Sequence, residues 1–404
     1  MDKKALENIK VADFCWGGAG PLMTKYLADY GATVIRIESG EKTDFLRTSG
    51  PYKDKIAGIN RSGFFNFYNA NKYSMELRLN LPKAVEVAKK MVLWADVVTE
   101  SFSPGKMADF GLDYESLKKI RPDVIMLSSS GQGQTGPNAR MPIAGNWLVA
   151  LTGFNWFTGW PDRGPVQPFG AYNDIIAPRF GVIAILGALR HRQRTGKGQY
   201  IDISQLQAGL QFLQPQLLDY TVNGNQGERM GNASPNAAPH GVYPCLEGRW
   251  CAIAIFTDDQ WSAFCDVIGD PSWTKETRFE TLLDRKRNEE ELNAHVSSWT
   301  ENLTPEEVMY LLQKRGVPAG IVESPKDAYE DQQTNHRNYY WHLEHPEMGT
   351  YPHVGQTAIL SKSPAKGERP SPCLGEHTEW VCRELLKMTD EEFIELVNEG
   401  VFGL

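Results

Sequence analysis

The sequence predicts an α/β protein in which a large domain with a mainly parallel sheet is interrupted by a smaller α+β domain. Three observations predict this organisation. The chain has 404 residues, which is long for one ordinary domain. Strand-like and helix-like segments alternate through its first half, and the composition changes near residue 222. We therefore expect the large domain in residues 1–221 and 329–404, and the small domain with its linkers in residues 222–328.

Residues 9–39 have the pattern of a strand, a glycine-rich turn, a helix and a second strand. Residues 9–14 are short and apolar, residues 17–20 form the turn, and Pro21 suits the first helical position. Residues 33–38 are rich in β-branched side chains and favour a strand. This βαβ unit predicts two parallel strands with a right-handed connection, the start of a Rossmann-like domain.

The same alternation continues to residue 203. The expected elements, in order, are a helix at 83–95, a strand at 96–100, a short helix capped by Asp113, a strand at 124–127, an apolar helix at 176–194, a turn at 195–198 and a strand at 200–203.

The smaller domain begins after a segment with few bulky apolar residues, 222–240, which is typical of a linker or mobile loop. Residues 242–245 and 250–256 flank a turn and predict an antiparallel hairpin. Helices follow to residue 314, one of them opened by a capping box at Thr304, and a second box lies at Thr389.

Composition excludes several classes of partner. A formal net charge of -8 and a pI near 5.6 argue against a broad basic face for nucleic acid or anionic lipid. The six cysteines are scattered without a C-x-x-C pair, as in reduced cytosolic proteins. The longest apolar run, residues 180–189, is about half a membrane span. We expect a cytoplasmic protein that binds neither nucleic acid nor membrane.

Two glycine-rich segments invite a dinucleotide-binding interpretation. Residues 131–136 fit G-x-G-x-x-G but lead into Pro137 rather than an apolar helix, so they favour a structural turn. Glu38 stands where a Rossmann fold would bind a ribose, yet residues 17–20 lack the phosphate-binding spacing. An NAD-dependent oxidoreductase is therefore disfavoured, although the backbone N–H groups of the first turn could still hold an anionic or carbonyl group.

Histidine chemistry is also disfavoured. No histidine precedes His191, so a Ser-His-Asp or Cys-His site would need one from the C-terminal half. His342 and His345 have no nearby cysteine and indicate a surface pair in a loop rather than a metal site. We expect neither a catalytic triad nor a bound metal.

Asp174 is the one charged residue between Arg163 and Arg179, just before the apolar helix. A carboxylate in this place is either an N-cap for that helix or a nucleophile, which needs only positioning, partial desolvation and an activated electrophile. The residues alone favour the cap and leave both interpretations open.

Over nearly its whole length the chain resembles class III CoA-transferases, the family of formyl-CoA and carnitine CoA-transferases. The matching segments are residues 11–14, 19–21, 27–38, 71–72, 95–98, 104–105, 131–137 and, most specifically, His191-Arg-Gln-Arg-Thr-Gly-Lys-Gly-Gln199. The resemblance implies a large Rossmann-like domain, an interlocked dimer, and acyl-CoA and carboxylic acid substrates with no permanently bound cofactor.

The resemblance also assigns residues. It makes Asp174 the nucleophile, acting through an acyl-aspartyl anhydride and an aspartyl-CoA thioester. It places the coenzyme A site at Gly18, Ala19, Leu77, Arg78, Ser101, Phe102 and Lys106. The sequence departs from the formyl-CoA transferase pattern at Gly18, where that pattern has its active-site glutamine, and at Asp109, where it has a basic residue. A family lysine falls near Pro142, with Arg140 close by as a substitute.

Racemases of the same family carry a catalytic Gly-His-Asp motif, but residues 143–147 offer no such base. Residues 159–163 and 218–224 resemble benzylsuccinate CoA-transferase subunits, which implies succinyl-CoA as donor and an aromatic acid as acceptor. The chain is then a homodimer or one half of a heteromer, and a non-catalytic paralogous subunit is the main alternative. Several aromatic residues fit core or subunit packing or a substrate pocket: Trp16, Trp147, Phe154, Trp156, Phe157 and Trp160.

Overall fold

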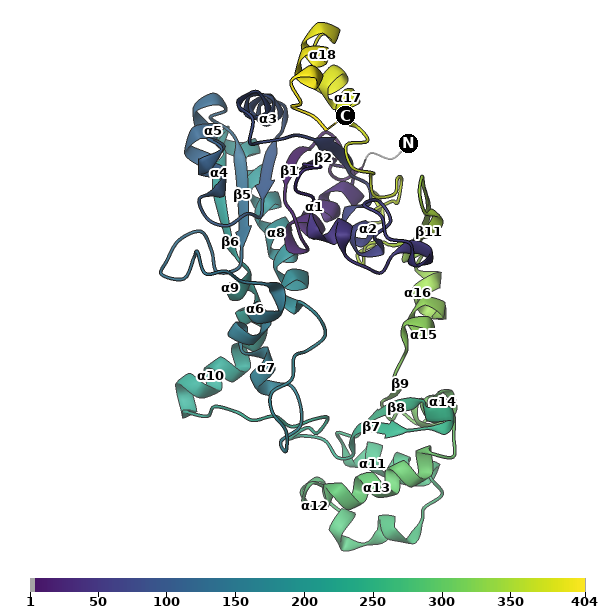
Figure 1. Cartoon of the computed structure of the whole chain (residues 1–404). Helices are drawn as coiled ribbons and strands as arrows, with labels where there is room; N and C mark the ends of the chain where they lie inside the picture. Colours follow the sequence, from purple (N-terminus) through teal and green to yellow (C-terminus); the bar gives the residue numbers. More distant parts are fainter. Residues whose placement is uncertain (1–3, 404) are drawn as a thin grey trace. The chain divides into compact units, whose positions relative to one another are not determined.

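The computed structural model describes residues 4–403, which form two compact units (Figure 1). The larger unit contains the chain up to residue 155, residues 167–226 and the chain from residue 335 onward. The smaller unit contains residues 156–166 and 227–334. The small domain was expected at residues 222–328. The observed unit begins and ends slightly later than that range, and it also contains the upstream segment 156–166.

A six-stranded sheet forms the centre of the larger unit. All of its neighbouring strands are parallel, and their order is that of the Rossmann fold. In spatial order the strands are β3 (Tyr73–Glu76), β2 (Thr33–Glu38), β1 (Lys10–Phe14), β4 (Val97–Glu100), β5 (Ile125–Ser130) and β6 (Gln199–Ser204).

Helices cover both faces of this sheet, because alternate residues of each strand are apolar on both sides. On one face, Val11 and Val97 pack with α1 and α8; on the other, Ala12 and Val98 pack with α3, α5 and the C-terminal segment. The helices of the chain up to residue 226 are α1 (Ala19–Asp29), α2 (Gly63–Asn69), α3 (Pro82–Trp94), α4 (Lys106–Asp109), α5 (Tyr114–Ile120), α6 (Gly145–Thr152), α7 (Phe154–Phe157), α8 (Tyr172–Thr195), α9 (Gln205–Leu210) and α10 (Gln214–Asn223).

Local signals in the sequence explain where several elements end. Asp113 caps α5 by accepting a hydrogen bond from the Ser116 backbone, as expected. Gly196 ends α8 in the left-handed conformation that glycine adopts at low cost. Helix α1 begins at Ala19, so Pro21 lies inside its first turn rather than at the first helical position.

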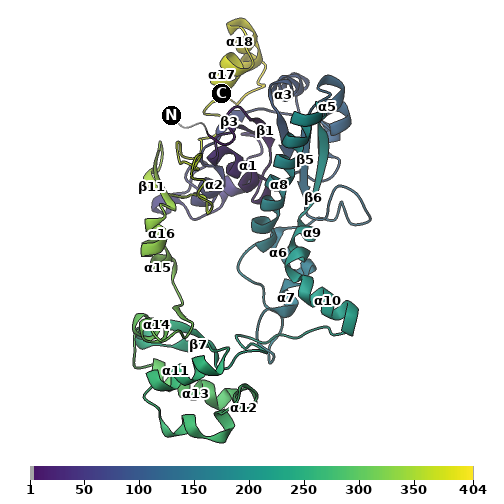
Figure 2. The same cartoon turned by 180° about the vertical axis from the view of Figure 1, so that it is seen from behind.

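Helix α8 runs beside β5 and β6 and contacts α1 and α9 (Figure 2). Among residues 4–403 it is the one helix whose length and apolar composition would suffice to cross a membrane, a test that core helices of soluble proteins also pass.

The smaller unit pairs an antiparallel sheet with helices. The predicted hairpin is confirmed as β7 (His240–Pro244) and β8 (Trp250–Ala254), and β9 (Ala319–Ile321) adds a third strand to β8. The capping box at Thr304 is present at the start of α14. The helices are α11 (Asp258–Val267), α12 (Leu282–Arg287), α13 (Glu289–Thr300), α14 (Pro305–Gln313) and α15 (Pro325–Glu330), with α16 (Gln332–His336) at the boundary.

The C-terminal segment packs against the edge of the large sheet, as expected for a domain built from both chain ends. The Arg78 backbone N–H donates to the Val401 carbonyl, and the His377 N–H donates to the carbonyl of Ser74 in β3. Figure 1 shows this segment in green and yellow. It contains the hairpin β10 (Tyr340–His345) and β11 (Gly349–Val354), and the helices α17 (Thr378–Trp380) and α18 (Asp390–Asn398), the last opened by the box at Thr389.

Candidate active site

A cavity of about 400 Å³ lies at the carboxyl ends of β1, β4 and β5. This is the edge of an open parallel sheet at which ligands characteristically bind, next to the point where the strand order reverses between β1 and β4. Its lining comes from the turn after β1, the loops after β4 and β5, and the starts of α6 and α8. It includes Trp16, Gly18, Ala19, Ser101, Phe102, Ser130, Gly131, Arg140, Gly145, Leu148 and Asp174.

Asp174 lies in the first turn of α8 and is not its cap. The helix begins at Tyr172 with Ala171 as N-cap, and no side chain caps it. The reason for this earlier start is Asn173, whose buried amide donates to Thr152 Oγ1 at 2.8 Å and to the Gln205 carbonyl at 3.0 Å. These bonds hold the first turn in helical form, so the prediction that Asp174 favours a capping role is wrong.

The Asp174 carboxylate faces the cavity without an ion pair or hydrogen bond to its side chain within residues 4–403. The residue is half-buried. Burial raises its pKa to about 6, because no nearby cation or donor stabilises the charged form. Burial of Tyr68, together with the nearby Asp174 charge, raises the pKa of Tyr68 to about 12. A desolvated carboxylate that is still ionised at neutral pH is suited to nucleophilic attack.

Two glycines allow close access to this carboxylate. A Cβ atom on Gly18 would lie 3.3 Å from Asp174 Oδ2, and one on Gly145 would lie 2.8 Å from the same oxygen. A larger side chain at either position would therefore occupy space next to the reactive oxygen.

Buried charges hold the turn between β1 and α1. Asp44 Oδ2 accepts a hydrogen bond from Gly17 N at 3.0 Å and is paired with Arg36. Arg36 also donates to the Cys15 carbonyl at 2.8 Å, and Asp13 accepts from Cys15 N at 3.1 Å. These hydrogen bonds fix the backbone of this turn.

Glu38, the residue in the ribose position of a dinucleotide fold, belongs to the same buried network. Arg47 donates to both of its carboxylate oxygens, at 2.7 and 2.8 Å. The two arginines Arg36 and Arg47 hold the pKa of Glu38 at about 2 against the opposing effect of burial. Its oxygens are already committed to these partners, which agrees with the sequence-based argument against a nicotinamide enzyme.

A second cavity, of about 480 Å³, adjoins the first and shares Trp16, Phe102 and Ser103 with it. The structure brings most of the expected coenzyme A residues to these two spaces. Gly18, Ala19 and Ser101 line the first cavity, Leu77 and Lys106 line the second, and Phe102 lines both. Arg78 lines neither; its guanidinium lies 3.4 Å from the Glu41 carboxylate.

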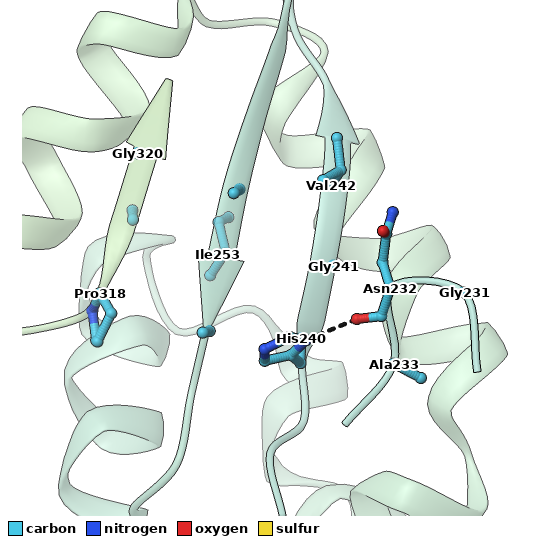
Figure 3. A pocket seen from close by; sticks show the side chains of 12 residues that line it. Gly231, Asn232, Ala233, His240, Gly241, Val242, Ile253, Pro318 and Gly320 are labelled. Atoms are coloured by element: carbon cyan, nitrogen blue, oxygen red, sulfur yellow. Dashed lines mark hydrogen bonds between the residues drawn. The ribbon is translucent and has the colours of Figure 1, made fainter. Parts of the chain in front are cut away.

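The smaller unit has a cavity of its own, of about 490 Å³, on its three-stranded sheet (Figure 3). Small side chains line it, and its one titratable residue is His240, whose Nδ1 lies 2.6 Å from the Asn232 carbonyl oxygen. Nothing in that lining supplies a nucleophile, so the cavity containing Asp174 is the better candidate for chemistry.

The interpretation of His342 and His345 as a surface pair in a loop needs correction on both points. His342 and His345 lie in strand β10, not in a loop, and three residues apart on a strand they point to opposite faces. His345 is also buried rather than on the surface. Residues 4–403 contain no cluster of three or more acidic, histidine or cysteine side chains suited to a metal ion.

The aromatic residues that precede Asp174 in the sequence differ in burial: Phe154 packs against the core cluster of Ile176 and Ala177, whereas the tryptophans of residues 147–160 are exposed. Trp147 is 64% exposed, and Trp156 and Trp160 are about half exposed. Of the aromatic set, Trp16 alone lines the Asp174 cavity. Sequence reasoning missed Ser130 and the role of Gly145 beside Asp174. The predicted strand ended at residue 127, whereas β5 continues to Ser130 and brings it to the carboxyl edge of the sheet, where ligands bind.

Comparison with known proteins gives consistent matches along the chain. Residues 6–378 match the sequence profile of CoA-transferase family III. A succinate–glutarate CoA-transferase of Agrobacterium fabrum is 33% identical over 95% of this chain and 96% of its own length. A succinyl-CoA–D-citramalate CoA-transferase of Chloroflexus aurantiacus is 30% identical over 98% of both chains. The beta subunit of a succinyl-CoA–L-malate CoA-transferase from that organism is also 30% identical over 98% of both.

A solved structure supports the same relationship. The crystal structure of a CaiB/BaiF family protein from Brucella suis superimposes with a TM-score of 0.87, at 32% identity, over 95% of this chain and 100% of that one. The Mycobacterium tuberculosis protein Rv3272 shares the fold, with a TM-score of 0.78 over 94% of this chain, at 23% identity.

Proposed function

Since the chain belongs to CoA-transferase family III and is a class III CoA-transferase, we propose that Asp174 is the nucleophile that accepts the acyl group and then coenzyme A. The observation that carries this proposal is the Asp174 carboxylate, which lines the cavity without a partner and has a raised pKa. The glycines beside it leave its Oδ2 accessible to a thioester carbon.

Four displacements at carbonyl carbons complete the transfer. Asp174 attacks the donor thioester, a C–O bond forms, and the C–S bond breaks to release coenzyme A thiolate and leave an acyl-aspartyl anhydride. The thiolate attacks the aspartyl carbonyl and expels the donor carboxylate, giving an aspartyl-CoA thioester. The acceptor carboxylate attacks this thioester and releases the thiolate again. The thiolate then takes the acceptor acyl group and frees Asp174.

Coenzyme A fits the pair of adjoining cavities. The thioester end would lie in the first cavity, and the nucleotide end would pass Phe102 and Ser103 into the second. Phe102 offers an aromatic face for the adenine, and Lys106 offers a cation for phosphate. Arg140 lines the first cavity, is exposed and has no ion pair within residues 4–403, so it is free to meet an anionic substrate group.

We propose succinyl-CoA as donor and a dicarboxylic acid as acceptor. The relatives named above use succinyl-CoA or succinate with glutarate, D-citramalate or L-malate. Benzylsuccinate, which is also a dicarboxylic acid, stays a candidate acceptor, because Trp16, Phe45 and Leu148 give the cavity an apolar part that can accept a phenyl ring.

We propose that the working form is an interlocked dimer, of two identical chains or of this chain with a related subunit. Large apolar side chains are exposed on α8 and α10, among them Ile183 at 66%, Leu218 at 61% and Val222 at 76%. Exposed apolar faces of this kind are typical of subunit interfaces. Light scattering of the purified chain, alone and co-expressed with candidate partners, tests this.

Trapping the intermediate tests the function. The protein is incubated with succinyl-CoA, treated with hydroxylamine, and its peptides are weighed by mass spectrometry. We expect a hydroxamate on the peptide containing Asp174, and none in Asp174→Asn. The acceptor is then identified by assaying glutarate, D-citramalate, L-malate and benzylsuccinate with the unsubstituted protein. An unmodified peptide with every CoA thioester tested would show that Asp174 is not the nucleophile.

A further inference from the structure

Two residues that line the Asp174 cavity each carry a buried polar side-chain atom without a hydrogen-bond partner within residues 4–403. Ser130, the last residue of β5, is 7% exposed, and its Oγ has no partner. Trp16 follows β1, and its indole Nε1 is buried without an acceptor. Both residues line the cavity. A buried donor without an acceptor is costly and rare in folded proteins, so two such atoms in residues that line one cavity point to a ligand that satisfies them.

The first turn of α1 adds backbone donors to the same wall. The N–H groups of Gly17 and Trp16 are already used, by Asp44 Oδ2 at 3.0 Å and by Ser101 Oγ at 2.9 Å. Those of Gly18, Ala19 and Gly20, at the start of the helix, have no acceptor within residues 4–403. Unpaired N–H groups at a helix start carry a partial positive charge and favour an oxygen anion.

We propose that Ser130 Oγ, Trp16 Nε1 and the first N–H groups of α1 form an oxyanion site that holds the carbonyl oxygen of the acyl group during attack by Asp174. This inference rests on the proposed function and adds the residues that activate the electrophile. Ser130 and Trp16 would touch the reacting atoms and would be catalytic residues.

The electron flow shows why donors are needed at this wall. As Asp174 Oδ bonds to the thioester carbon, the π pair of the carbonyl moves onto its oxygen, so the negative charge passes from the carboxylate to that oxygen. When the pair returns, the C–S bond breaks and coenzyme A thiolate leaves. No proton is transferred in either step. Donors that meet the oxygen chiefly when it is charged lower the barrier without tightening ground-state binding.

The geometry of the cavity supports this assignment. Gly18 contributes both to the donor wall and to the close approach to Asp174 Oδ2, since a Cβ on it would lie 3.3 Å from that oxygen. The Gly18 N–H donor and the Asp174 nucleophile therefore belong to residues that lie next to each other. Hydrogen bonds with Asp13, Arg36 and Asp44 hold the turn, so its N–H groups are in place before substrate arrives.

Single-turnover acylation by succinyl-CoA tests the inference, with quenching at short times and quantification of the Asp174 adduct. We expect Ser130→Ala and Trp16→Phe each to slow acylation by about 100-fold or more with the KM of the donor changed less than threefold, as for loss of one oxyanion donor. Ser130→Thr, which keeps a hydroxyl, should retain activity within a few-fold. Ser297→Ala on α13, far from the cavity in sequence and in the other unit, is the matched control.

Thermal unfolding separates a catalytic role from a structural one. Because Ser130 Oγ is unsatisfied in the folded protein, Ser130→Ala should unfold at an equal or higher temperature while it reacts more slowly. Acylation of both variants within twofold of the unsubstituted rate would overturn the oxyanion site and leave the role of Asp174 intact. Absence of any adduct in the unsubstituted protein would overturn the proposed function and this inference together.

Discussion

Gly145, the first residue of α6, lies against Asp174 so closely that a Cβ on it would be 2.8 Å from the carboxylate Oδ2 and 2.4 Å from the Ala171 Cβ. Real Cβ atoms do not approach neighbours that closely, so the start of α6 fits beside the nucleophile only as glycine. The space next to the reactive oxygen is thus set by an element that is separate in the chain from α8.

This contact predicts that Gly145→Ala displaces or covers the Asp174 carboxylate and lowers kcat by about 100-fold or more, because misplacement of a nucleophile by about 1 Å is enough for such a loss. Steady-state assays check it. Gly187→Ala is the control. Gly187 lies on α8, the helix that carries Asp174, and a Cβ there would meet nothing within 4 Å. That variant should keep full activity and gain about 0.5–1 kcal/mol of stability. Equal activity of the two variants would contradict the prediction.

The raised pKa of Asp174 predicts the acid limb of the pH profile. Attack requires the ionised carboxylate, so kcat/KM for the acyl-CoA donor should be constant at neutral pH and fall about tenfold per pH unit below about 6. Initial rates across the acid range check it. An acid limb centred near the ordinary aspartate value of about 3.9 would contradict the desolvation argument.

The same shift predicts that the nucleophile costs stability. A carboxyl whose pKa is higher in the folded state binds more protons there than in the unfolded chain, so stability falls as pH rises from about 4 to about 6 and stays reduced above that range. We expect Asp174→Asn to raise the free energy of unfolding by about 1–2 kcal/mol at neutral pH and to have little effect near pH 4. Urea denaturation at the two pH values measures this, and a gain independent of pH would contradict it.

The buried Lys72 should be a structural residue. Its Nζ lies 3.1 Å from Asp13 Oδ2 and donates to the Pro21 carbonyl at 2.8 Å, within the first turn of α1. Burial lowers its pKa to about 8 despite the Asp13 charge. Lys72→Met leaves Asp13 without its closest cation and should cost about 3 kcal/mol.

Lys83 provides the comparison for Lys72. Its ion pairs with Glu395 and Glu399 are solvent-exposed, so Lys83→Met should destabilise the protein far less than Lys72→Met. Denaturation of both variants measures the difference, and similar losses would contradict the assignment of Lys72 to a buried network.

Arg140 is expected to contribute to binding rather than to the chemical step. It is the one cation in the lining of the Asp174 cavity and has no ion pair within residues 4–403. Arg140→Gln should raise the KM of an anionic substrate by about tenfold, the loss expected for a charge-assisted hydrogen bond, and change kcat by less than about threefold. Arg315→Gln in the smaller unit is the control. An unchanged KM for every substrate would remove Arg140 from the binding site.

Much of the fold follows from local patterns. Strand β2 has the bounds that its β-branched run predicts, and the caps at Asp113, Thr304 and Thr389 lie where their sequences place them. Both capping boxes depend on residues within one helical turn, so the sequence suffices to predict them. The start of α8 could not be predicted in this way, because Asn173 is held by Thr152 and Gln205, one from an earlier and one from a later segment.

The sequence by itself determined the α/β class and the parallel sheet, because periodicity and capping are properties of neighbouring residues. Its resemblance to class III CoA-transferases indicated the family and made Asp174 the candidate nucleophile. Only the tertiary structure decided that Asp174 lies inside the first turn of α8 and is desolvated, and that Gly18 and Gly145 border it. It also decided that Ser130 and Trp16 line the same cavity, each with a buried side-chain atom that has no partner within residues 4–403. Those facts depend on where β1, β5, α6 and α8 converge. Burial and the absence of a hydrogen-bond partner are properties of that convergence and not of any one segment.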